Sequence, residues 1–284
     1  MSKKANHQRK DIQDKISWLV KKCTLPFDLQ RILIEDQFQI TKLGKHTSQG
    51  YDAISTDTTP VRKLHNLPST RNVERLLKHF AKTSIKRKQQ QAYKDATDGD
   101  ACLAKICHDY NSFALEMITL FNSMLPNYLL YHSEHVQFSN VCEKGRSNNQ
   151  DPHEENGETL QVAASQIYSG EFLLRMLVRL PNVISTFQEM MSSSSSVSHK
   201  EGSTSSSSSC DTNNVPVLHH WGRAVMEDGT TTGQILSELI SYLSKNKVKI
   251  FRGEYRGVTV DEYTKTERKF AEKQRSRQRK LNET

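Results

Sequence analysis

The stretch from Gln166 to Ile184 constrains the fold more than any other part of the chain. At about 100° per residue, its large apolar side chains share one broad helical face. They are Phe172, Leu173, Met176, Leu177, Leu180 and Ile184. Leu174 and Val178 widen this arc and leave Arg175 and Arg179 as the charged stripe, whereas a surface helix has a narrower apolar face. The pattern predicts a central core helix; the alternative is that Leu174, Val178 and Arg179 turn towards a partner.

Further segments repeat apolar residues at helical spacing and predict an all-α, multi-helix bundle. The expected helices cover about residues 12–20, 25–40, 68–80, 101–124, 127–138 and 234–247. Ser69 or Thr70 is the expected N-cap of the third one. A weak alternation from Val61 to Leu67 indicates a short strand, which we expect to pair with Gln39–Leu43 as one β-hairpin.

Polar segments divide the chain into a helical body and its additions. The body is expected over residues 25–264, after a basic N-terminal tail with a short helix (1–24) and before a basic C-terminal tail (265–284). Insertions at about 44–59, 141–163 and 192–232 are rich in Ser, Asn, Gly or Glu. Such composition cannot bury enough apolar surface to offset the ordering entropy, so these segments are expected to be disordered loops.

The charge is concentrated at the two ends. The chain carries +8 overall, and residues 1–22 and 265–284 each carry +5, so the body is close to neutral. No apolar run is long enough to span a bilayer, and the N-terminus has no hydrophobic signal core. Basic ends suit nuclear import or weak, non-specific contact with nucleic acid. A nucleic-acid-binding module that acts through these tails is therefore the alternative function.

Catalytic and metal-binding patterns are missing from the sequence. It has no glycine-rich phosphate loop, nucleophile elbow or HExxH helix, and its five cysteines do not have zinc spacing. The histidines outside the serine-rich segment stand in polar or amphipathic surroundings, which indicates surface or boundary positions. These are His65, His79, His108, His132 and His135. We therefore expect no enzyme, no cofactor and no metal.

Five segments occur in the order found in MRG-domain proteins. They are LPFDLQRILIEDQFQIT, LHNLPSTRNVERLLKHF, FNSMLPNYLLY, IYSGEFLLRMLVRLP and ILSELISYLSKNKVKIF. The chain resembles this family, the mortality-factor-related and male-specific-lethal chromatin subunits, over most of Leu25–Tyr263. LLRMLVRLP and LPNYLLY are the most specific of the matching pieces.

The resemblance implies an all-α, non-catalytic nuclear adaptor of histone acetyltransferase and deacetylase complexes. Partner subunits of this family insert short segments, often with a Phe-x-Leu-Pro core, into a hydrophobic groove. By position, the resemblance places the groove at Leu25, Leu33, Ile34, Tyr131, Val178 and Arg179. Val178 and Arg179 also lie off the main core face by helical periodicity alone. For Leu33, Ile34 and Val178 an ordinary core position remains the alternative, whereas the polar ends of Tyr131 and Arg179 favour the groove.

Two positions depart from the family pattern. Many members carry a tryptophan where this chain has Gln37, so either Phe38 replaces that anchor or the groove prefers a different peptide. Members often carry an N-terminal chromodomain with an aromatic cage for methyl-lysine. Residues 1–24 hold one aromatic residue, Trp18, so we expect this chain to lack a chromodomain and not to read methyl-lysine itself.

Overall fold

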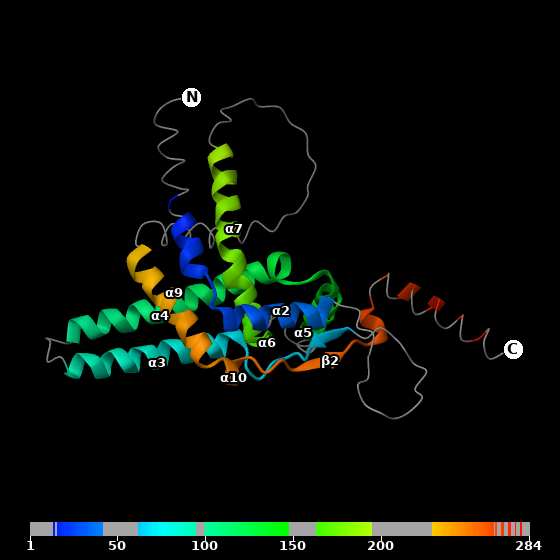
Figure 1. Cartoon of the computed structure of the whole chain (residues 1–284), viewed down its shortest axis with the longest axis horizontal. Coiled ribbons are helices and arrows are strands. Elements are labelled where there is room, and N and C mark those ends of the chain that lie inside the picture. The colour runs from blue at the N-terminus through cyan, green and yellow to red at the C-terminus, as the bar shows by residue number, and fades with distance from the viewer. Residues whose placement is uncertain are drawn as a thin grey trace, which may run out of the picture.

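The computed structural model describes residues 16–41, 62–94, 100–147, 163–194 and 229–263, with single positions at residue 14 and between residues 265 and 279. Most of them are helical, and the prediction of an all-α fold with one short β element is confirmed (Figure 1). The expected insertion at 44–59, and most of the other two, lie outside the described residues.

The elements follow one another in a mainly helical order, after helical residues at 16–23. They are α2 (Phe27–Thr41), β1 (Lys63–His65), α3 (Val73–Lys94), α4 (Asp100–Met124), the π-helix η1 (Leu125–Leu129), the 3-10 helix η2 (His132–Glu134), α5 (His135–Ser147), α6 (Ala164–Ile167), α7 (Gly170–Ser194), α9 (Gly229–Lys245), α10 (Lys247–Ile250), β2 (Tyr255–Gly257) and the 3-10 helix η4 (Val260–Glu262).

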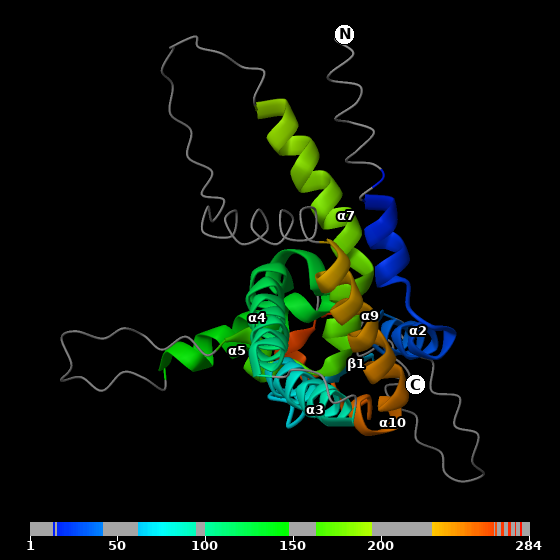
Figure 2. The ribbon, with the colours of Figure 1, turned by 90° about the vertical axis from the view of Figure 1, so that its left-hand side faces the viewer.

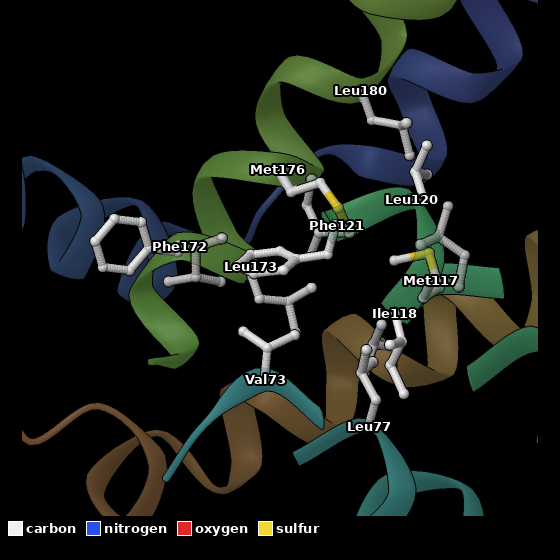
Figure 3. Close-up of a cluster of buried hydrophobic side chains, with 14 of the residues drawn as sticks. Val73, Leu77, Met117, Ile118, Leu120, Phe121, Phe172, Leu173, Met176 and Leu180 are labelled. Atoms are coloured by element: carbon white, nitrogen blue, oxygen red, sulfur yellow. The ribbon is translucent and has the colours of Figure 1, made fainter. Parts of the chain in front are cut away.

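The core lies where α7 meets the paired helices α3 and α4. Figure 1 shows α3 and α4 side by side and α7 rising from between the other helices, with α2 crossing it. Figure 2 shows α9 beside α2, and α9 also contacts α4. The side chains that meet at the centre come from all three helices (Figure 3). They include Val73, Leu77, Met117, Leu120, Phe121, Phe172, Leu173, Met176 and Leu180. Periodicity therefore identified the core face of the central helix correctly.

The central helix is broken near its start. The expected helix from Gln166 is divided into α6 and α7 because Tyr168 is extended, with φ −90° and ψ 145°. The extended segment pairs with the start of α3, where the Val73 N–H donates to the Tyr168 carbonyl at 2.9 Å and the Asn72 side-chain nitrogen donates to the Gln166 carbonyl at 2.8 Å. The Asn72 side-chain oxygen also accepts the Arg75 N–H at 2.9 Å. Asn72 is thus the cap of α3, and the expectation of Ser69 or Thr70 was wrong.

The short strand forms, but with a different partner. β1 pairs antiparallel with β2, with Leu64 opposite Arg256 and His65 opposite Tyr255. The expected hairpin with Gln39–Leu43 was wrong, because residues up to Thr41 belong to α2. A short alternation of apolar residues indicates a strand but does not say which distant segment completes its hydrogen bonds.

Two helix boundaries also differ from expectation. The chain does not break at Leu125-Pro126; it continues as η1, and α5 then runs to Ser147. The helix expected at 127–138 is thus replaced by η1, η2 and the start of α5, and residues 141–147 are helical. At the other end of the serine-rich segment, α9 begins at Gly229 and takes up the last residues of the insertion expected to end at 232.

Candidate functional site

The first half of α7 is buried on every side, and its first exposed residues are Val178 and Arg179. Every residue from Glu171 to Leu177 is buried, whereas Arg179 is exposed and Val178 is 47% exposed. Because they follow Arg175 by three and four positions, both lie on the side of the helix that Arg175 occupies one turn earlier. The contacts of Arg175 therefore determine where these two side chains emerge.

The Arg175 guanidinium is buried and joins α7 to α2 and η2. Its Nε and Nη2 donate to Asp36 Oδ2 at 3.0 and 2.7 Å. Its Nη1 and Nη2 donate to the two carboxylate oxygens of Glu134 at 2.6 and 3.1 Å, and Nη1 also to the Leu129 carbonyl at 3.0 Å. These bonds match the five N–H donors of a guanidinium. The expectation that Arg175 forms an outer charged stripe with Arg179 was wrong.

Two aromatic rings lie close to the same guanidinium. Its central carbon is 4.1 Å from the centre of the Tyr131 ring and 4.2 Å from that of Phe172. Phe172 is fully buried, whereas Tyr131 is half-buried. We call the buried side chains of Arg175, Asp36 and Glu134 the charge cluster. Tyr131 therefore lies at the boundary between the charge cluster and the surface. Burial raises the pKa of its hydroxyl, so the phenol is neutral near pH 7 and can donate or accept a hydrogen bond.

Asp36 uses its second carboxylate oxygen to hold the β1–β2 sheet. Oδ1 is 2.7 Å from His65 Nε2 and accepts a hydrogen bond from the Tyr255 hydroxyl at 2.9 Å. Burial by itself would raise the pKa of Asp36, but the His65 hydrogen bond and the Arg175 charge outweigh it and hold this pKa below its usual value. One carboxylate thus connects α2 with α7, β1 and β2.

His65 is a core residue. It is 2% exposed, and its ring centre is 4.8 Å from those of Phe172 and Tyr255. The expectation of a surface or boundary position was therefore wrong for His65. The Asp36–His65 pair resembles half of a catalytic arrangement, but it is closed off from solvent and its oxygens are occupied by structural partners. Within the described residues, no group of three metal-ligating side chains could hold a metal ion.

The residues of the expected groove differ in exposure. Leu25 belongs to the core at 3% exposed, and Ile34 is 66% exposed. Leu33 and Tyr131 are half-buried, and Gln37 and Arg179 are exposed. All but Leu25 offer accessible atoms, so we call Leu33, Ile34, Gln37, Tyr131, Val178 and Arg179 the junction surface. Within the described residues, Arg179 makes no ion pair.

The Asp36–Arg175–Tyr131 contacts bring most of this surface together. Leu33 and Gln37 are within one helical turn of Asp36, as Val178 and Arg179 are of Arg175. The positive charge of Arg179 is close enough to act on the Tyr131 hydroxyl. Ile34 lies on the opposite side of α2 from Asp36 and contributes the outer edge. The Arg175 contacts with Asp36 and Tyr131 thus join the elements that carry these apolar, aromatic and cationic side chains.

The MRG family model matches residues 52–200, just over half of the chain. The chain belongs to the MRG family. The MRG domain is a chromatin-associated protein-interaction domain, and its family is non-catalytic. A comparison with curated proteins gives no match. The matched residues include Tyr131, Val178 and Arg179 of this MRG protein, whereas its helices α2 and α9 lie outside them.

The charge cluster beneath the junction surface was missed from sequence, although a signal for it exists. Asp36 comes seven residues after Leu29 and four before Ile40, which places a carboxylate on the buried face of α2. Arg175 likewise interrupts a run that is otherwise apolar on most of its circumference. Buried charges are almost always paired, so these two residues were candidates for each other. Glu134 and His65 carry no comparable local signal.

Proposed function

We propose that this MRG protein is a nuclear, non-catalytic adaptor of histone acetyltransferase or deacetylase complexes. In this proposal the junction surface binds a short hydrophobic segment of a partner subunit, with a Phe-x-Leu-Pro-like core. The observation that carries the proposal is the exposure of Val178 beside Arg179, which makes no ion pair within the described residues, one helical turn after the buried and hydrogen-bonded Arg175. Among the described residues, no helix has the length and apolar character needed to cross a bilayer.

The chemistry of the surface supports a peptide as the ligand. Leu33, Ile34 and Val178 offer apolar contacts, and Tyr131 offers an aromatic face with a hydroxyl at its edge. Aromatic and arginine side chains are enriched at the centres of protein interfaces, where truncation of an anchor typically costs about 2 kcal/mol or more. Arg179 is available to the main-chain carbonyls or a carboxylate of a bound segment. The contacts of Arg175 with Asp36 and Glu134 hold the elements beneath this surface in place before binding, which lowers the conformational-entropy cost of association.

Gln37 affects the preferred peptide. Where many family members have a tryptophan, this chain offers an exposed amide, and Phe38 next to it is 50% exposed on the outer side of α2. An amide donates and accepts hydrogen bonds, so we expect partners of this chain to place a polar group opposite Gln37. Replacement of Gln37 by Trp should then strengthen binding of an apolar Phe-x-Leu-Pro peptide.

Calorimetric titration with a Phe-x-Leu-Pro peptide tests the proposal. Val178→Asp places a charge in the apolar part of the junction surface and should weaken binding about thirtyfold, equivalent to about 2 kcal/mol. Leu115→Asp is the matched control, because Leu115 is 64% exposed on α4, away from the junction surface. It should leave the affinity unchanged. Equal affinities of the wild-type and Val178→Asp chains would contradict the proposed site.

A further inference from the structure

A second surface hollow lies between the start of α3 and the corner formed by α9 and α10. It has a volume of about 540 Å³. Figure 2 shows α10 beside α3, and Figure 1 shows it beside the beginning of that helix. The hollow shares no residue with the junction surface. Its volume lies within the usual range of ligand sites, about 300–1,000 Å³.

The rim of this hollow is cationic on both sides. Arg71 and Arg75 come from the α3 side, Lys249 and Arg252 come from α10 and the residue stretch after it, and no lining residue is acidic. Two carboxylates, Glu171 and Glu254, line a small separate hollow that Arg71 and Arg252 also border. We call the 540 Å³ hollow the basic cleft.

The cations of the basic cleft are not neutralised by the fold. Within the described part of the chain, Arg71, Lys249 and Arg252 make no ion pair, and Arg75 donates only to the Thr70 carbonyl, at 3.2 Å. Other basic residues nearby are neutralised, since Lys247 pairs with Asp28 and Arg256 with Glu262. Four cations without an ion pair in the described part of the chain border one hollow, so an anion that enters it is attracted by all of them.

The floor of the cleft is apolar. Leu76 is 7% exposed and Ile250 is half-buried, and both line the hollow. At the far end, His79 Nδ1 and the Tyr242 hydroxyl are 2.7 Å apart and close the cleft with a hydrogen-bonded pair. From its first residue, Val73, to His79, α3 rises about 9 Å at about 1.5 Å per residue. An extended segment of about three residues has this length.

These features select one class of ligand. The phosphates of a DNA duplex contact an exposed basic surface and leave an apolar floor unfilled. A peptide can place an aliphatic side chain on Leu76 and Ile250 while its carboxylates reach the two basic rims. We propose that the basic cleft binds a short acidic peptide of a partner protein, with Asp or Glu on both sides of an aliphatic residue. This is a second binding surface, independent of the junction surface.

The test uses the full chain and a defined probe, a fluorescein-labelled Glu-Asp-Asp-Leu-Glu-Asp peptide, with fluorescence anisotropy as the readout. The double variant Arg71→Glu/Lys249→Glu reverses one charge on each rim and should weaken binding about tenfold or more. The control, Lys86→Glu/Lys105→Glu, makes the same change in net charge at exposed residues away from the cleft. It should change the affinity by less than about twofold. Circular dichroism would establish that both variants keep the helical fold.

Four outcomes would overturn the proposal. The first is the absence of probe binding at about 1 mM protein, where a complex with a Kd of about 1 mM would still be detected. The second is equal weakening by the cleft variant and the control, which would mean that only net charge matters. The third is equal affinity for a probe with Ser in place of Leu. The fourth is displacement of the probe by duplex DNA with the same dependence on Arg71 and Lys249. Titration with the Phe-x-Leu-Pro peptide on the same variants separates this result from the proposed function, since it should be unaffected.

Discussion

Arg175 and Arg179 are identical residues one helical turn apart, yet they have opposite roles. Arg175 is buried between two carboxylates and two aromatic rings, whereas Arg179 is exposed and unpaired within the described residues. The difference arises from Asp36 and Glu134, which α2 and η2 bring to the first position only. Removal of one member of a buried ion pair leaves the other charge without compensation, and such losses are much larger than those of exposed pairs.

Arg175→Met keeps the side-chain length and removes the charge. We expect a loss of about 3–5 kcal/mol of unfolding free energy, because Asp36 and Glu134 then remain buried without their counter-charge. Arg179→Met should change stability by less than about 0.5 kcal/mol, as surface substitutions usually do. Urea denaturation of both variants measures the difference. Similar values for the two would show that the charge cluster does not stabilise the fold.

The stability of the fold at acid pH depends on the pKa of Glu262. Burial opposes the charge of Glu262, but hydrogen bonds from Arg256 and Thr259 outweigh it and lower its pKa from 4.5 to about 2. Because the folded-state pKa lies below the unfolded one, this stabilisation is present above about pH 4.5 and is lost as the pH falls towards 2. Asp36, whose pKa is also lowered, acts in the same direction.

Glu262→Gln should therefore reduce stability at pH 7 and flatten its decline below pH 4.5. The measurement is the unfolding free energy from urea titrations at a series of pH values between 7 and 2. A decline in the variant as steep as in the wild-type chain would contradict the role given to Glu262.

At the scale of elements, α7 begins where three side chains crowd its backbone. A Cβ on Gly170 would lie 2.9 Å from Ile250 Cγ2, 3.0 Å from Phe251 Cε1 and 3.2 Å from Leu76 Cδ1. A methyl group at this point would force the Ile250 side chain, or α10 with it, to shift. Leu76 and Ile250 also form the floor of the basic cleft, so this close approach shapes the cleft as well as the core.

Gly170→Ala should destabilise the protein by about 1–3 kcal/mol, the usual cost of overpacking, even though alanine is the better helix former. Gly257→Ala is the control, because a Cβ there would meet nothing within 4 Å. Thermal unfolding of both variants gives the comparison. A Gly170→Ala chain as stable as the control would show that α10 moves aside without cost.

The sequence was most informative where apolar residues repeat regularly and least informative where single polar residues decide the structure. The core faces of α3, α4, α7 and α9 follow from helical periodicity, because burial of one face is a property of the helix itself. The break before α7 involves the Asn72 side chain, and the partner of β1 is about 190 residues away. Neither the break nor the strand pairing is marked by a local pattern in the sequence. For the candidate site, periodicity indicated Val178 and Arg179, but the cluster that positions them is a long-range arrangement.

At the scale of the whole molecule, the two ends of the described body are joined at one place. β2 follows the last long helix and pairs with β1, and the Arg62 guanidinium donates to the Glu262 carbonyl at 2.7 Å. Tyr255 connects this sheet to Asp36 and hence to α7. The contacts around Asp36 therefore include residues from both the beginning and the end of the described body, and they join the elements beneath the proposed peptide site.

The most direct test of the proposed peptide site is methyl NMR of the full chain during titration with a Phe-x-Leu-Pro peptide. We expect the methyl signals of Leu33 and Val178 to shift and to saturate with one affinity. The signals of Leu115 and Val248, exposed elsewhere on α4 and α10, should stay in place. Shifts at Leu115 or Val248 without shifts at Leu33 and Val178, or no shifts at all, would contradict it.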